Sequence, residues 1–142
     1  MKVSRYKLNF PAMMRLYETN YAQLRRLLPR NYQLNDDVVF NVELMTYRIE
    51  ILEVTRYTTL VLIQQVKPNV SYWAMPEIKV RLYHDALIAE VCACQQISRF
   101  KAIYDYPVQI KYQSDEKHQI NQFLADWLKF CLMYGTTSAL VC

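Results

Sequence analysis

The sequence predicts an α+β fold, a curved antiparallel sheet of five or six strands flanked by an N-terminal and a C-terminal helix. Near both ends of the chain, apolar residues recur at spacings of three and four, the period of an amphipathic helix. Between them, residues 38–104 are rich in Val, Ile, Thr and Tyr and show no helical period, which favours strands. The connections between these strands are short, so neighbours must be antiparallel. We expect both helices to pack on one face of the sheet.

The first helix is predicted over 12–28. Pro11 suits an early helical position because its fixed φ matches the helix and its missing N–H would have no partner there. Pro29 ends the pattern. The apolar stripe consists of Met14, Tyr17, Tyr21, Leu24 and Leu28.

Six strands are predicted near 38–45, 47–54, 57–66, 77–83, 86–93 and 97–104. The segment 57–66 is apolar on both faces, which is typical of a central strand. A two-residue turn at His84-Asp85 would pair Lys79 with Glu90, stacking apolar on apolar along the hairpin. A longer loop is the alternative, because a tight turn favours glycine and this segment has none.

The last helix is predicted over 115–133, with Ser114 as its N-cap. Gly135 is expected to supply the left-handed residue that ends many helices. The buried face should consist of Ile120, Phe123, Leu124, Trp127, Leu128 and Cys131.

The composition excludes several classes of site. The 142 residues, 53% of them hydrophobic, indicate a single globular domain over 1–142. The single glycine excludes dinucleotide-binding, phosphate-loop and nucleophile-elbow motifs, which all need several. With two histidines and no HExxH, no three-histidine zinc site is possible, and we expect no metal and no cofactor. The sequence shows no membrane span and no secretory signal, so we expect a cytoplasmic protein with four free thiols.

His84 and Asp85 are the weak catalytic candidates. An adjacent histidine and carboxylate suit a general base and its orienting group, although neighbours at a turn usually point apart, and a simple polar turn is the other interpretation. Cys92 and Cys94 are spaced to share a strand face and either hold a metal or, as we favour, belong to the core.

Positive charge is concentrated near the N-terminus, where residues 1–34 hold seven basic residues and one acidic residue. A second basic group is expected where the polar faces of the strands predicted at 77–83 and 97–104 meet. Basic groups interleaved with aromatic rings suit single-stranded nucleic acid or an acidic peptide, and an ordinary solvated surface is the alternative. The candidate ligand-binding residues are Arg25, Arg26, Arg30, Arg81, Arg99, Lys101, Tyr72 and Trp73.

Five long strings of the sequence look familiar: FPAMMRLYETNYAQLRRLLPR at 10–30, TRYTTLVLIQQ at 55–65, SYWAMPEIKVRLYHDALIAEVC at 71–92, QQISRFKAIYDYP at 95–107 and DEKHQINQFLADWL at 115–128. They resemble the YqiB-like family of small bacterial proteins with a domain of unknown function. The resemblance implies a bacterial cytoplasmic protein, and it carries no assigned reaction, cofactor or catalytic residue.

Our first hypothesis is a non-enzymatic binding or regulatory module that engages RNA or an acidic protein. The alternatives are a small hydrolase-like enzyme centred on His84 and Asp85, and a structural homodimer that covers one sheet face. A concave pocket around His84 would favour the enzyme, and an open basic surface would favour the binding module.

Overall fold

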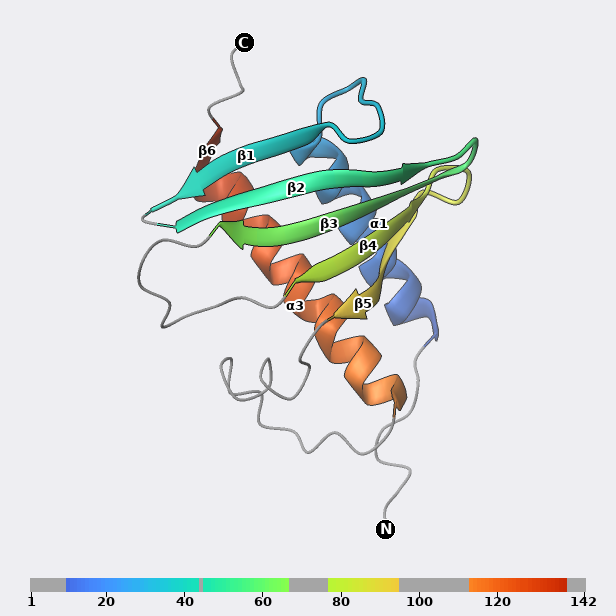
Figure 1. Ribbon diagram of the computed structural model, residues 1–142. Coiled ribbons are helices and arrows are strands. Elements are labelled where there is room, and N and C mark those ends of the chain that lie inside the picture. The colour runs from blue at the N-terminus through green and yellow to red at the C-terminus, as the bar shows by residue number, and fades with distance from the viewer. Residues whose placement is uncertain (1–9, 44, 67–76, 95–112, 138–142) are drawn as a thin grey trace.

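The computed structural model describes residues 10–43, 45–66, 77–94 and 113–137, which form two helices and a six-stranded antiparallel sheet (Figure 1). Helices α1 (Phe10–Leu27) and α3 (Gln113–Tyr134) lie side by side on one face of the sheet. The strand order is β5-β4-β3-β2-β1-β6. The strands are β1 (Asp37–Val42), β2 (Met45–Val54), β3 (Thr58–Val66), β4 (Ile78–Tyr83), β5 (Ile88–Cys94) and β6 (Gly135–Thr137). The α+β prediction is confirmed, and so is the central position of the strand predicted at 57–66.

The core lies between the helices and the sheet because β1, β3 and β4 alternate buried and more exposed residues. Along β4, for example, Ile78, Val80 and Leu82 are fully buried, while Lys79 and Arg81 point to the other side. On α3, Trp127 packs its ring against Phe40 of β1 and Tyr47 of β2. No described helix covers the opposite side of the sheet, which we call the open face (Figure 1). Its residues include Val39, Arg48, Glu50, Leu60, Leu62, Lys79 and Arg81.

The expected roles of Ser114 and Gly135 at the ends of α3 are wrong. The helix already begins at Gln113, so Ser114 lies inside it. Gly135 does not have a positive φ; it is the first residue of β6, which no sequence pattern indicated. A Cβ at Gly135 would lie 2.6 Å from the carbonyl oxygen of Cys131. Glycine is therefore needed because the chain turns from α3 directly into a strand against the last helical turn.

The predicted two-residue turn at His84-Asp85 is also wrong, and the longer loop is present. Tyr83 pairs with Ile88, so four residues, His84–Leu87, form the connection between β4 and β5. Leu87 has a φ of 60° and donates its N–H to the carbonyl oxygen of Tyr83 at 2.8 Å. The two added residues shift the register so that Arg81, rather than Lys79, lies opposite Glu90.

A buried asparagine of α3, Asn121, hydrogen-bonds to the outer edge of β5. The side-chain oxygen of Asn121 on α3 accepts the backbone N–H of Val91 at 2.9 Å, and its amide donates to the carbonyl oxygen of Lys117 at 2.8 Å. The amide of Asn20 on α1 donates to the carbonyl oxygen of Asn121 at 3.3 Å. Asn20 and Asn121 are both fully buried. The pair joins both helices to the sheet edge and satisfies a strand N–H that would otherwise have no partner.

In the part of the chain described, neither helix has the length and apolar character that a membrane crossing requires. The strand predicted at 97–104 lies outside the described residues.

Candidate functional site

His84 occupies a polar cluster beneath the C-terminal half of α1. Its Nδ1 atom lies 2.9 Å from the hydroxyl of Tyr21, and its Nε2 atom lies 2.8 Å from Oγ1 of Thr59 and 3.3 Å from the hydroxyl of Tyr32. The hydroxyls of Tyr32 and Thr59 are themselves 2.7 Å apart. We call these four residues the His84 cluster. Both nitrogens of the imidazole are therefore engaged by hydroxyl groups.

Four different elements bring the cluster together. Tyr21 comes from the flank of the apolar stripe of α1, and Thr59 comes from the buried face of β3. Tyr32 comes from the segment after α1, which is held against β2 because the N–H of Asn35 donates to the carbonyl oxygen of Ile51 at 2.9 Å. His84 follows β4, and its own N–H donates to the carbonyl oxygen of Tyr57 in the β2–β3 hairpin at 2.8 Å.

The surroundings of His84 favour the neutral form of its ring. Burial lowers the pKa of His84 most, and the positive charge of Arg25 lowers it further, while Asp85 acts in the opposite direction. Arg25 follows Tyr21 by one helical turn, and its guanidinium carbon lies 5.8 Å from the centre of the Tyr32 ring. Arg25 thus adds a cation to the edge of the His84 cluster.

The geometry differs from that of a catalytic histidine dyad. Among the described residues, no carboxylate hydrogen-bonds to the ring of His84, and Asp85 is exposed beside it. Thr59, the hydroxyl nearest to Nε2, is 1% exposed and is closed to a substrate. The cluster can hold and exchange protons among hydroxyls and one imidazole, but it presents no activated nucleophile at the surface.

The arginines divide into those that are paired with acids and those that are not. On the open face, Arg81 lies 3.3 Å from Glu53, and Arg48 lies 2.9 Å from Asp37. At the C-terminal end of α1 we define the arginine group as Arg25, Arg26 and Arg30. Within the described ranges, none of these three forms an ion pair with a carboxylate.

Beside Arg26, the surface forms an open hollow of about 170 Å³ between α1, β1 and the end of α3. Apart from Arg26, its lining is apolar or backbone: Leu27, Val38, Phe40, Cys131, Leu132 and Gly135. None of the residues that line this hollow belongs to the His84 cluster.

The sequence-predicted ligand residues do not all come together. Arg25 joins His84, whereas Arg81 points to the open face on the other side of the sheet from α1. No sequence pattern indicates Tyr21, Tyr32 and Thr59 as partners of His84. The spacing of Tyr21 places it on the apolar stripe, and no local pattern places Tyr32 near β3. Four candidates lie outside the described residues: Tyr72, Trp73, Arg99 and Lys101.

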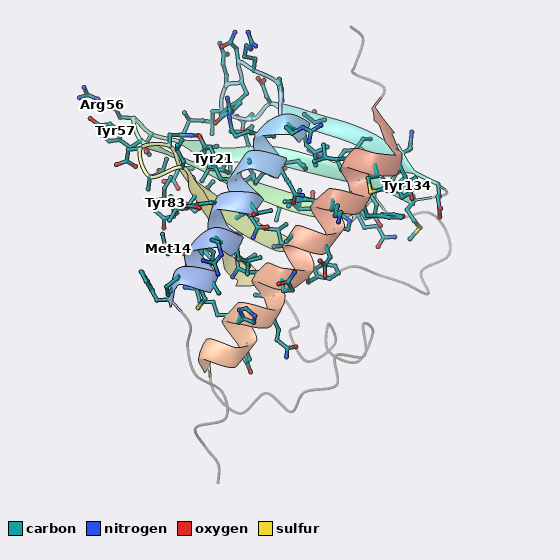
Figure 2. All side chains as sticks on the ribbon, turned by 180° about the vertical axis from the view of Figure 1, so that it is seen from behind. Met14, Tyr21, Arg56, Tyr57, Tyr83 and Tyr134 are labelled. Atoms are coloured by element: carbon teal, nitrogen blue, oxygen red, sulfur yellow. The ribbon has the colours of Figure 1, made fainter. Side chains whose placement is uncertain are left out.

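The β2–β3 hairpin carries an exposed basic side chain next to an exposed aromatic side chain. Figure 2 shows Arg56 and Tyr57 at the tip of the β2–β3 hairpin, with Tyr83 and Tyr21 nearby. The Arg56 guanidinium carbon lies 5.3 Å from the centre of the Tyr57 ring, and Tyr57 is 51% exposed.

The cysteines do not combine into a metal site in the described part of the chain, where no group of three or more His, Cys, Asp or Glu side chains has metal-binding geometry. The expectation of a core position is wrong for Cys92, which is exposed because the β4–β5 register shift leaves it opposite no partner. Cys131 is buried, and burial raises the pKa of its thiol to about 12.

The comparisons with known proteins show the family. Residues 23–137 match the family model described as "Protein of unknown function (DUF1249)". The chain belongs to this family. It is also 59% identical over 133 residues to "Uncharacterized protein YqiB" of Escherichia coli strain K12, an alignment that covers 94% of this chain and 95% of the relative. The proteins of the same name from the O6:H1 and O157:H7 strains match to the same extent. No solved structure matches the chain.

Proposed function

We propose that this protein is a cytoplasmic, non-enzymatic binding module, formed by residues 1–142 as one domain, that engages single-stranded RNA through the arginine group. The observation that carries the proposal is the set of three arginines at the end of α1 without a carboxylate partner in the described ranges. Arginine binds phosphate through paired N–H donors and stays charged at all relevant pH values.

Aromatic rings that lie against arginine side chains favour RNA over an acidic protein. Tyr57 and Arg56 project from the β2–β3 hairpin (Figure 2), and Tyr32 lies beneath Arg25. Single-stranded RNA offers bases that stack on such rings and phosphates that neutralise the arginines, whereas an acidic protein uses only the charge.

We propose a second contact group for the RNA, which consists of Arg81, Arg99 and Lys101 with Tyr72 and Trp73. It has to be tested separately from the arginine group, because Arg81 lies on the open face and is paired with Glu53. An RNA phosphate at Arg81 would replace that carboxylate.

Single charge reversals with a matched control test the proposal. The change in fluorescence anisotropy of a labelled single-stranded RNA oligonucleotide gives the Kd for wild type, Arg25→Glu, Arg26→Glu and Arg15→Glu. Arg15 is exposed on the same helix, about three turns before Arg25 and Arg26, so it controls for net charge. We expect Arg25→Glu and Arg26→Glu each to weaken binding roughly tenfold, about 1.4 kcal/mol, and Arg15→Glu to change it little.

Equal effects of the three reversals would contradict a specific arginine site. If the wild type binds an acidic protein but not the oligonucleotide, with the same dependence on Arg25 and Arg26, the RNA proposal is wrong and the acidic partner replaces it. Turnover of a hydrolysable substrate that His84→Gln abolishes would favour the enzyme alternative, and concentration-dependent association through the open face would favour the homodimer.

A further inference from the structure

The His84 cluster contains more hydrogen-bond donors than its own contacts can use. Three hydroxyls and one neutral imidazole supply four hydrogens. One hydrogen forms the hydrogen bond between Tyr21 and Nδ1, and one forms the hydrogen bond between Tyr32 and Thr59. A third forms the hydrogen bond between Nε2 and either Thr59 or Tyr32. Nε2 has either a hydrogen or a lone pair, so its contacts with Thr59 and Tyr32 together use a single strong hydrogen bond. One hydroxyl hydrogen therefore has no acceptor inside the cluster.

The tautomer of His84 decides which tyrosine holds the unused hydrogen. With the proton on Nδ1, Tyr21 accepts from the ring, and its own O–H is left over. With the proton on Nε2, Tyr21 donates to Nδ1, the buried Thr59 accepts from the ring and donates to Tyr32, and the O–H of Tyr32 is left over. Tyr21 and Tyr32 are both partly exposed, whereas Thr59 is buried, so the unused hydrogen belongs to a residue that reaches the surface.

Arg25 makes the unused donor specific for an anion. Its guanidinium lies over the Tyr32 ring, and within the described residues it has no carboxylate partner. A cation next to a free O–H donor favours a ligand that is negatively charged and has only acceptors. A phosphate group meets both conditions.

We propose that Arg25, Tyr21, Tyr32 and His84 form a binding site for a single phosphate group, and that protonation of His84 strengthens this binding. The inference deepens the proposed function, on which it rests, by assigning one phosphate of the RNA to a defined site. When His84 is protonated, both ring nitrogens donate, so Tyr21 and a hydroxyl of the Tyr32–Thr59 pair are released as donors and a second cation appears beside Arg25.

The charged and titratable groups around His84 are consistent with this coupling. Arg25 and Tyr21 face it from α1, Tyr32 from the following segment and Asp85 from the β4–β5 loop, while Thr59 of β3 does not titrate. Without a ligand, burial and Arg25 lower the pKa of His84 and Asp85 offsets only part of this. A bound phosphate supplies negative charge that outweighs Arg25, so the pKa of His84 must rise when the anion binds.

The two histidines of the chain make the test direct. The ring C–H signals of His84 and His118 are followed by NMR across a pH titration, in inorganic phosphate and in chloride of equal ionic strength. His118→Gln assigns the signals, and sulfate, whose charge stays constant over the titration, serves as a second tetrahedral anion. We expect phosphate and sulfate to raise the pKa of His84 by about one unit, equivalent to tenfold tighter anion binding by the protonated form, without moving His118.

Variants separate the site from a general effect of anions. Arg25→Gln should abolish the shift of His84, Arg25→Lys should retain part of it, and Arg15→Gln should retain all of it. Unchanged amide spectra confirm that each variant is folded. Coincident titrations of His84 in phosphate, sulfate and chloride would overturn the inference, as would an undiminished shift in Arg25→Gln.

The outcome is distinguishable from that of the proposed function. If RNA binding depends on Arg25 and Arg26 while His84 ignores phosphate and sulfate, the phosphate site is wrong and the RNA-binding module stands. If His84 responds as expected while RNA does not bind, the phosphate site stands for a small anion and the RNA proposal is wrong.

Discussion

Replacing Asn121 by alanine removes the acceptor that satisfies the edge of β5. In the native protein, the side-chain oxygen of Asn121 accepts the N–H of Val91 at 2.9 Å, in a position with no solvent exposure. The variant leaves that N–H without its partner, whereas the bond from Asn20 to the backbone oxygen of Asn121 does not require the side chain.

The expected cost follows from these contacts. A buried donor that loses its acceptor costs about 1–3 kcal/mol, and truncating a fully buried side chain adds a packing loss. The lost amide contact with Lys117 is minor, because that carbonyl already belongs to the helix. Alanine regains about half a kcal/mol through its higher helix propensity. We therefore expect Asn121→Ala to lower the free energy of unfolding by about 2–3 kcal/mol.

Urea unfolding measures the expected loss of stability, and amide hydrogen exchange measures whether the N–H of Val91 is still protected. The matched control is Gln122→Ala, since Gln122 is the next residue of α3 and its side-chain amide donates to the exposed Asp126 at 3.2 Å. The control should stay within about 0.5 kcal/mol of wild type. The N–H of Val91 should lose its protection in Asn121→Ala alone. A variant as stable as the control, with Val91 still protected, would refute the role assigned to Asn121.

Three further predictions concern the core, the β4–β5 loop and the thiols. Trp127 is 7% exposed, so Trp127→Ala should cost about 3–5 kcal/mol in urea unfolding, and a loss below about 1 kcal/mol would contradict its packing on Phe40. Leu87 has a φ of 60° and is 57% exposed, so Leu87→Gly should stabilise the protein by about 0.5–1 kcal/mol, and destabilisation would argue against this loop conformation. Iodoacetamide should modify Cys92 much faster than Cys131 in the folded protein, because burial raises the Cys131 pKa to about 12; mass-spectrometric peptide mapping should show equal modification only after unfolding.

The fold was largely predictable because the periodicities are local. The spacing of apolar residues located both helices, and the two-sided apolar character of 57–66 identified the central strand. The two features that were missed depend on backbone geometry that the hydrophobic pattern does not reveal. Gly135 is required by its closeness to the carbonyl of Cys131, and the β4–β5 register depends on Leu87 adopting a positive φ that its residue type does not favour.

The candidate site was predictable only in part, because the partners of His84 come from segments far from it in the sequence. His84 and Arg25 stood out as a rare histidine and one of a run of arginines, but their partners did not. Tyr32 reaches His84 only because the segment after α1 is tied to β2. Arg81 was grouped with Arg25 by charge, yet strand alternation turns it to the open face, away from α1. Charge in the sequence therefore indicated an anion partner without indicating which side of the sheet faces it.

The salt dependence of RNA binding tests the central claim most directly. If the arginine group neutralises three phosphates, log K should fall with log salt with a slope of about −2, since each phosphate contact of a single strand contributes roughly 0.7. Arg25→Glu combined with Arg26→Glu should reduce the steepness of that slope by at least about 1.4, while Arg15→Glu should leave it nearly unchanged. A wild-type slope near zero, or an equal slope in the doubly reversed variant, would contradict the assignment of phosphate contacts to this end of α1.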